Sequence, residues 1–431
     1  MPLPTEDSLK IGLLIPEFPG QTHVSWWRVG QAIRREGISV QMLSTRRSPD
    51  ADKPVHNFLY AESQQTFYAW PVSAGRVLRR LLASPKGAWQ ALMYLAQLPE
   101  STWAEKLKLL PVWLSAANLC DFAITQDLQH IFVHSCANAA HLVALCHRMG
   151  GPAYSLRLGG DLEVYGKDHS AKMAKASFIA SASETYLDKL VHEVGVSEDR
   201  VFWTWVGVDT RTFTPSPAKP IAQASSEGPF RLATVARLNE FKGYQYVIEA
   251  LHQIKQQGLD VVYTVAGTGP YRPAIEALIE KLGLQSSVTL VGALGQQQVV
   301  DLLRQSDAFV LASFAKGEAS PAVVSEAMAC GLPVVCTRIG STHLMIEDQV
   351  DGFLVPQADA SAITAALSEL IRSPEIRNRI GAAALAKSKT FDTQAVAQKL
   401  LARMFPEKFP QLLMSTKRHR IVSTPVTKTE T

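Results

Sequence analysis

The sequence contains few cysteines and little excess charge of either sign. Its 431 residues include five cysteines, an odd number, and none of them forms a C-x-x-C pair. A disulfide framework and a cysteine-ligated metal are therefore not expected, and a reducing cytoplasm is the expected compartment. The formal net charge is only +4, which argues against bulk nucleic-acid binding.

Long uninterrupted apolar runs are also missing. No run reaches the roughly 18 residues needed to span a bilayer. The first residues, MPLPTEDSLK, lack the basic segment and apolar core of a secretory signal. Hydrophobic residues still make up 47% of the chain and charged residues 19%, as in ordered globular proteins. At roughly 150 residues per domain, the length suits two or three domains.

The first half alternates apolar strands with amphipathic helices. Residues 11–15 (IGLLI) predict a buried strand, and a loop is expected after them. The segment from Val24 has helical spacing and ends at Gly37, a glycine suited to a helix C-terminus. Further strands are expected at 39–45, 131–134, 153–158, 177–181 and 201–207. This order predicts a doubly wound parallel sheet.

One segment of the first half, residues 73–119, has a different pattern. Aliphatic side chains alternate there with basic residues and tryptophans, namely Arg76, Arg79, Arg80, Lys86, Lys106, Lys108, Trp89, Trp103 and Trp113. Such helices can lie on an anionic membrane surface. Amphipathic helices that pack on their own domain have the same pattern. Peripheral contact through residues 76–113 with the cytosolic face of the inner (plasma) membrane is therefore one of two open interpretations.

A second β/α series begins at Phe230, after a Pro-, Ala- and Ser-rich linker at 215–229. Strands are expected at 230–236, 261–267, 288–292, 308–313, 333–337 and 352–356, and the last helices at 359–372, 374–388 and 393–405. The predicted organisation is a first domain at 1–214, a second at 230–392, a helix within 393–410 that returns to the first domain, and a disordered tail at 411–431. The fold class is therefore α/β, with two Rossmann-like, doubly wound domains facing each other across a cleft where ligands bind.

Two glutamates flank a predicted helix in the sequence GEASPAVVSEAMACG. Ser320 is the expected N-cap and Pro321 the first residue of a helix that ends at Cys330. Its N-terminus would face the cleft as an anion site. Glu318 and Glu326 could accept hydrogen bonds from two parts of one ligand. Alternatively, Glu318 is a surface acid near the helix dipole and Glu326 a solvated helix position.

Basic residues and glycines follow the first two strands of the second domain. Arg237 and Lys242 lie in the loop after the first strand, and two cations at a strand end suit a diphosphate. Gly267 and Gly269, in VAGTGP, would let the backbone approach a phosphate or ribose closely. A basic surface loop and a simple turn are the alternatives.

Together these segments resemble the donor-binding half of the family 4 retaining glycosyltransferases, which have the GT-B fold. The likeness runs from Leu232 to Pro356 in the family's order and spacing. In the first half it is looser: PEFPGQTHVSWW and FVHSCANAA are similar to the subgroup that makes exopolysaccharides such as colanic acid. The resemblance implies transfer of a hexose from a UDP- or GDP-linked donor to a saccharide or lipid-linked acceptor, in exopolysaccharide or cell-envelope glycan synthesis.

The resemblance also implies roles for the second domain's residues. Arg237 and Lys242 would grip the donor diphosphate and stabilise the departing nucleotide. Glu326 would hydrogen-bond the ribose, and Glu318 would face the transferred sugar as a positioning group. Backbone N–H groups of the stretch that includes Ala319, Ser320 and Ala322 would bind the sugar and phosphates.

The first domain is expected to contribute as well. By resemblance, Gly20 approaches the diphosphate and Asp161 belongs to the site. Gly159 departs from the family, because a histidine that contacts the donor sugar usually stands there. His134 and His169 are the candidates to replace that histidine, although an ordinary core or surface residue is the more frequent case for either.

No metal or other cofactor is implied. The one D-x-D sequence, Asp50 to Asp52, lies in the polar loop RRSPDADKP and is expected to be solvated. Two alternatives to transfer remain open at this point. One is a nucleotide-sugar epimerase or hydrolase of the same fold. The other is a non-catalytic sugar-nucleotide binder, which Gly159 motivates.

Overall fold

Seven parallel strands form the sheet of the first domain. In the computed structural model, which describes residues 9–20, 24–49, 51–52, 54–217, 228–315 and 320–411, they are ordered β3-β2-β1-β4-β5-β6-β7. The strands are β1 (Lys10–Phe18), β2 (Ser39–Arg47), β3 (Phe67–Tyr68), β4 (His130–Val133), β5 (Ala153–Leu158), β6 (Ile179–Ser181) and β7 (Val201–Trp203). The strand order reverses beside β1. The predicted doubly wound parallel sheet is therefore present.

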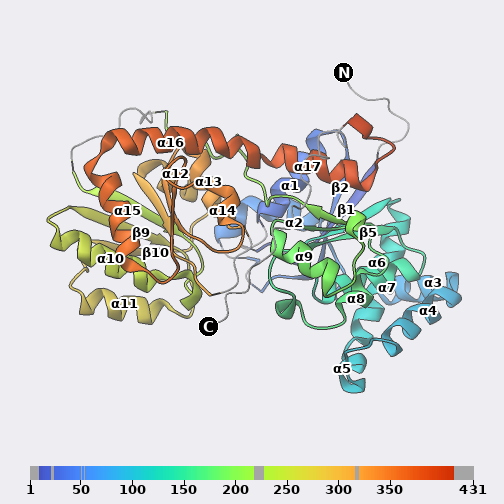
Figure 1. Ribbon diagram of the computed structural model, residues 1–431. Coiled ribbons are helices and arrows are strands. Elements are labelled where there is room, and N and C mark those ends of the chain that lie inside the picture. Colours follow the sequence, from blue (N-terminus) through green and yellow to red (C-terminus); the bar gives the residue numbers. More distant parts are fainter. Residues whose placement is uncertain are drawn as a thin grey trace.

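Helices cover both faces of this sheet (Figure 1). They are α1 (Val24–Arg35), α2 (Tyr60–Gln65), α3 (Ala74–Ala83), α4 (Pro85–Ala96), α5 (Trp103–Lys108), α6 (Leu110–Thr125), α7 (Asn138–Arg148), α8 (His169–Met173) and α9 (Glu184–His192). The helix α1 has the spacing that the sequence indicated, and Gly37 beyond its end has a φ of +82°. Glycine favours this left-handed conformation at helix ends.

The second domain repeats the arrangement with six parallel strands. Their order is β10-β9-β8-β11-β12-β13, and they comprise β8 (Phe230–Val235), β9 (Val261–Ala266), β10 (Val288–Gly292), β11 (Ala308–Leu311), β12 (Val334–Thr337) and β13 (Phe353–Val355). Its helices are α10 (Tyr244–Gln256), α11 (Arg272–Lys281), α12 (Gln296–Gln305), α13 (Ala322–Ala329), α14 (Thr342–Met345), α15 (Ala360–Arg372) and α16 (Pro374–Ser388). Both sheets thus have a point where the strand order reverses, and ligands bind at such points in open α/β sheets.

The helix α17 (Thr393–Met404) lies on the first domain, against α1. Figure 1 shows α16 and α17 in succession along one side of the molecule, so the chain passes from the second domain back to the first. The Gln394 side chain donates to the Ala32 carbonyl oxygen of α1 at 3.1 Å, and Gln398 donates to the Glu36 carboxylate at 2.9 Å. These contacts fasten α17 to α1.

Several element ends differ from the sequence predictions. The strand β1 runs on to Phe18, where a loop was expected, because Phe18 still pairs with Arg47 of β2. The two-residue strand β3 was not predicted. The helix α13 begins at Ala322, one residue later than predicted, since Pro321 has an extended ψ of 110°. Pro321 occupies the N-cap position that was predicted for Ser320, whose hydroxyl instead contacts the Met345 sulfur at 3.4 Å.

A helical stretch in the first domain, Trp103–Thr125, is long and apolar enough by length and composition to cross a membrane. It consists of α5 and α6, joined at Leu109. Half of its apolar window is buried inside the protein, as in the core helix of a globular domain. This feature alone is therefore weak evidence for a membrane span.

Candidate functional site

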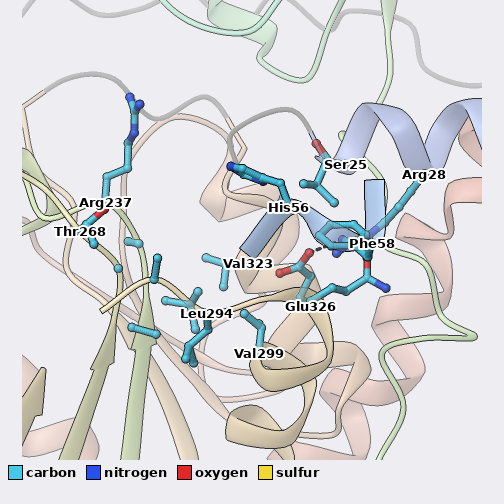
Figure 2. A pocket seen from close by; sticks show the side chains of 18 residues that line it. Ser25, Arg28, His56, Phe58, Arg237, Thr268, Leu294, Val299, Val323 and Glu326 are labelled. Carbon is cyan, nitrogen blue, oxygen red and sulfur yellow. Dashed lines mark hydrogen bonds and ion pairs between the residues drawn. The ribbon is translucent and has the colours of Figure 1, made fainter. Parts of the chain in front are cut away.

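A cleft of about 260 Å³ lies between the two domains. The first domain contributes α1 and a segment that includes His56 and Phe58, from the short 3-10 helix η2 (Pro54–Leu59) and its surroundings. The second domain contributes the loops after β8 and β9, and the N-terminal turns of α12 and α13. Figure 2 shows Arg237 on one side of the cleft and Arg28 with Glu326 on the other. The cleft therefore has groups suited to anions at one end and a carboxylate at the other.

The glycines of the β9 loop pack against the β8 loop. A Cβ on Gly267, whose φ is +147°, would lie 1.9 Å from the Ala236 carbonyl oxygen, and one on Gly269 would lie 2.2 Å from that of Leu238. The backbones of these two loops could not approach each other this closely if either glycine carried a side chain. Gly267 also lines the cleft. Backbone packing thus explains both glycines without reference to a ligand.

The two predicted cations follow β8, in different positions relative to the cleft. Arg237 lines the cleft and is exposed, and Figure 2 shows its side chain directed away from Glu326. Lys242 is the last residue of the short helix η6 (Glu240–Lys242) and is half-buried. The described lining of the cleft includes Arg237 but not Lys242. The structure thus brings one of the two cations into the cleft.

Glu326 is the most constrained of the predicted site residues. Its carboxylate Oε1 accepts a hydrogen bond of 2.5 Å from Nη1 of Arg28, on helix α1 of the other domain. The two side chains are only 12% and 8% exposed. The interpretation of Glu326 as a solvated helix position is therefore wrong. Sequence reasoning missed Arg28, which also lines the cleft.

Two of the residues predicted to offer backbone N–H groups, Ser320 and Ala322, lie within the described chain, and two other predicted site residues lie outside it. Ala322 begins α13 and lines the cleft. Ser320 is buried beside α14. Glu318 and Ala319 lie outside the described residues, so their roles remain predictions.

The predicted residues of the first domain follow the carboxyl ends of its strands. Gly20 comes just after β1. His134 comes just after β4, and its ring stacks on Trp26 at a centroid distance of 4.5 Å. Asp161 comes after β5 and precedes the short helix η3 (Leu162–Tyr165). The described lining of the cleft includes none of Gly20, His134 and Asp161.

The position at which the family has a histidine is crowded by a tyrosine. A Cβ on Gly159 would lie 3.3 Å from the Tyr165 hydroxyl oxygen. His169, one candidate replacement, is buried in α8, and burial together with the charge of Lys172 lowers the pKa of His169. It is therefore an interior residue, with a pKa below the ordinary value for histidine.

A second cavity, of about 470 Å³, opens at the carboxyl edge of the first domain's sheet. Its lining includes the half-exposed Trp70, the ion-paired Glu17 and Arg46, and the polar side chains of Ser135 and Asn138. An aromatic face with carboxylate, guanidinium, hydroxyl and amide groups is suited to a polyhydroxylated ligand. No sequence prediction identified this cavity.

An apolar, basic face covers the outer side of the first domain. We define this α3–α6 face by its exposed side chains Leu78, Leu82, Trp89, Trp103, Leu107 and Leu110. Residues 70–110 carry six basic and two acidic residues, a net charge of +4 that equals that of the whole chain. Figure 1 shows α3, α4 and α5 at the end of the first domain that lies farthest from the second domain. This surface is therefore separate from the cleft.

Comparison with known proteins agrees with this architecture. Residues 217–387 match the family described as glycosyl transferases group 1. The chain is 30% identical over 312 residues to the amylovoran biosynthesis glycosyltransferase AmsK of Erwinia amylovora, covering 70% of this chain and 74% of that protein. It is 27% identical over 386 residues to the putative colanic acid biosynthesis glycosyltransferase WcaL of Escherichia coli K12, covering 84% and 91%.

Solved structures share the fold. The crystal structure of Anabaena Alr3699/HepE in complex with UDP and glucose superimposes with a TM-score of 0.70 at 17% identity, covering 92% of this chain and 100% of that one. A glycosyltransferase from Rickettsia africae gives a TM-score of 0.70 at 16% identity, covering 93% and 99%. These are likenesses of fold, whereas the relatives identified by sequence are transferases rather than epimerases or hydrolases. The chain is therefore a glycosyltransferase of the GT-B fold, and it belongs to the group 1 glycosyl transferases, family 4.

Proposed function

We propose that the interdomain cleft binds a nucleotide-sugar, UDP- or GDP-linked, and that the enzyme transfers its hexose with retention of anomeric configuration. The observation that carries this proposal is the cleft itself, lined from opposite domains by Arg237, Gly267, Arg28 and Glu326. The complexes of Alr3699/HepE with UDP, and with UDP-glucose, support a nucleotide-sugar in a fold of this kind.

The proposed chemistry needs positive charge near the leaving group rather than a nucleophilic side chain. The bond between the anomeric carbon and the phosphate oxygen breaks, through an oxocarbenium-like state. The acceptor oxygen bonds to the same face, and its proton passes to the departing phosphate. Arg237, Lys242 and the N-terminus of α13 stabilise the developing negative charge. Glu318 positions the sugar.

The acceptor is proposed to enter from the first domain. Its saccharide would occupy the second cavity, against Trp70, Asn138 and the Glu17–Arg46 pair. A lipid-linked acceptor would be presented by the cytosolic face of the inner membrane, to which the α3–α6 face offers tryptophan, leucine and positive charge. Exopolysaccharide or cell-envelope glycan synthesis is the corresponding role, as in the named function of the amylovoran and colanic acid relatives.

Transfer is proposed to need no metal or other cofactor. Asp52, one end of the D-x-D sequence, pairs with Arg47 at 2.6 Å, and Asp50 lies outside the described residues. The cations that the reaction needs would instead be supplied by Arg237 and Lys242.

A thermal-shift screen across UDP- and GDP-sugars tests the donor assignment, because a ligand that binds only the folded state raises its melting temperature. The stabilising donor is then radiolabelled and incubated with membrane glycolipid extract, with and without EDTA. We expect acceptor-dependent transfer that EDTA leaves unchanged. Free sugar released without acceptor would indicate a hydrolase, and binding without turnover would indicate a sugar-nucleotide binder.

A further inference from the structure

Arg28 makes more contacts across the domain boundary than a salt bridge alone requires. It projects from α1 of the first domain, with its residue only 7% exposed. Its Nη1 donates to Glu326 Oε1 at 2.5 Å, and its Nε donates to Gln296 Oε1 at 3.1 Å. Its guanidinium carbon lies 4.8 Å from the ring centroid of Phe213. One side chain thus contacts α13, α12 and the segment that leaves the first domain.

These contacts fix the direction of the guanidinium. The ring of Phe213, itself buried, supports one face of the planar group. Gln296, the first residue of α12, accepts from Nε and so fixes its rotation. Because both supports are in place, Nη1 is held at one position, where it donates to a single oxygen of Glu326.

A carboxylate held through one oxygen keeps the other for a ligand. A glutamate in the second turn of a helix has several rotamers, and ordering it costs side-chain entropy. Arg28 removes that freedom before a ligand arrives. Within the described part of the chain, Glu326 Oε2 takes no hydrogen bond, and Glu326 lines the cleft. The pair is therefore a preorganised acceptor for hydroxyl groups.

We propose that Arg28 is a positioning residue that orients Glu326 toward the hydroxyls of the donor ribose. This inference rests on the proposed function and on the role that the family resemblance implies for Glu326, a hydrogen bond to that ribose. It adds a residue of the first domain to nucleoside recognition, so the nucleoside is bound by a group that only the assembled pair of domains provides. Arg28 acts through Glu326 and not through the diphosphate.

The test is the ratio of two dissociation constants measured on each protein. Calorimetric titration with UDP and 2′-deoxy-UDP, or with GDP and 2′-deoxy-GDP if guanine is preferred, isolates the 2′-hydroxyl. For the natural protein we expect the ribonucleotide to bind roughly ten- to a hundredfold more tightly, the range of one hydrogen bond to a charged group. Glu326→Ala should bring this ratio to about one.

Arg28→Ala should lower the same ratio by at least about threefold, and Arg28→Lys, which keeps a charge but not the fork of donors, should give an intermediate value. A ratio unchanged in both Arg28 variants, with both nucleotides weakened equally, would show a merely structural or phosphate-binding role and would overturn the inference. If Glu326→Ala itself left the ratio unchanged, the ribose-binding role that the family resemblance implies for Glu326 would fail first.

Folding does not confound this comparison, because both nucleotides are measured on the same protein. Arg28→Ala leaves a poorly exposed carboxylate without its partner, which can cost several kcal/mol of stability. The double variant Arg28→Ala/Glu326→Gln removes the unpaired charge. It should restore the melting temperature while the ratio stays near that of Glu326→Ala. Recovery of the ratio together with the stability would also contradict the inference.

Discussion

Arg237 and Lys242 are the single residues on which the proposed chemistry depends most. Both follow β8, Arg237 within the cleft and Lys242 at the end of η6. We expect Lys242→Ala to lower kcat by at least about a hundredfold, since removing one preorganised group from a developing charge has that effect. Transfer of radiolabelled hexose measures the loss, and circular dichroism checks the fold.

The matched control for this variant is Lys281→Ala, at the end of α11, where the side chain is exposed. It should retain full activity. Equal activity of the Lys242 and Lys281 variants would reject the role given to Lys242.

We expect that a substitution of Gly267 acts first on the stability of the fold and only secondarily on ligand binding. Its φ of +147° and the 1.9 Å approach of the Ala236 carbonyl oxygen leave no room for a Cβ. Gly267→Ala should therefore lower the free energy of unfolding by more than about 3 kcal/mol. Gly258→Ala is the control, because Gly258 has a φ of +75° but nothing within 4 Å. It should cost about 1 kcal/mol in urea denaturation, and similar losses for both would contradict the packing argument.

Some residues of the cleft could be predicted from the sequence and others could not. Arg237 and Gly267 could be predicted as cleft residues because they directly follow strands, and parallel strands end at one edge of a sheet. Arg28 could not, since it meets Glu326 from 298 positions away. Nothing in the local pattern of α1 distinguishes an arginine that crosses a domain boundary from one that faces water.

Among the elements, one carboxylate connects α2 and the neighbouring η2 to α1. Glu62 of α2 accepts hydrogen bonds from Arg34 at 2.7 Å, from Gln31 at 3.1 Å and from Trp27 at 3.2 Å, all on α1. Trp27 in turn contacts the ring of Phe58 at a centroid distance of 5.8 Å. Glu62 thus holds in place the segment that brings Phe58 to the cleft.

This carboxylate gives the protein a defined acid sensitivity. Burial raises the pKa of Glu62, but the hydrogen bond and charge of Arg34, with the other donors, outweigh burial and leave the pKa lowered. The folded protein therefore binds this proton less readily than the unfolded chain does. Its stabilisation is complete above the unfolded value of 4.5 and is lost as the pH falls through the lower folded value.

We expect Glu62→Gln to be less stable than the natural protein by about 1–3 kcal/mol at pH 7. The difference should shrink as the pH falls below 4.5. Urea denaturation of both proteins between pH 7 and pH 3.5 measures it, with Glu249→Gln on the exposed side of α10 as the control. If the difference in stability between the two proteins stays constant over this range, the Arg34–Glu62 ion pair does not contribute as proposed.

Element boundaries were predictable where local chemistry decides them. The strands β5 and β10 have the predicted bounds, as does α16 (Pro374–Ser388), which starts with a proline after a capping serine. The extension of β1 and the existence of β3 were not predictable, because both depend on pairing with β2. Which strands pair depends on residues that are distant in the sequence, so a short stretch of sequence does not reveal it.

At the scale of the whole molecule, the α3–α6 face adjoins the second cavity, so one amphiphilic acceptor can contact both. Trp70 lines the second cavity and is half-exposed, and Leu110 of the face adjoins Pro111 of the cavity. A bilayer on this face would hold the acceptor lipid while its saccharide enters the first domain.

Vesicle co-sedimentation tests this arrangement. Vesicles of phosphatidylglycerol and phosphatidylcholine at low salt should bind the protein. Lys86→Gln/Lys108→Gln should weaken binding by roughly thirtyfold, at about 1 kcal/mol for each basic residue near an anionic surface. The control, Val291→Ser/Val350→Ser, changes two exposed apolar residues of the second domain and should bind normally. No binding at low salt would exclude the membrane arrangement.

The central claim is that the cleft between the two domains binds the nucleotide of the donor. Calorimetric titration with UDP and GDP tests it most directly, using the natural protein, Arg237→Ala from the second domain and Arg231→Ala, an exposed residue of β8, as the control. The account predicts binding of at least one nucleotide, weakened at least about tenfold by Arg237→Ala, as expected for a charge-assisted contact, and unchanged in the control. Equal affinity in all three proteins, or no binding of either nucleotide, would contradict it.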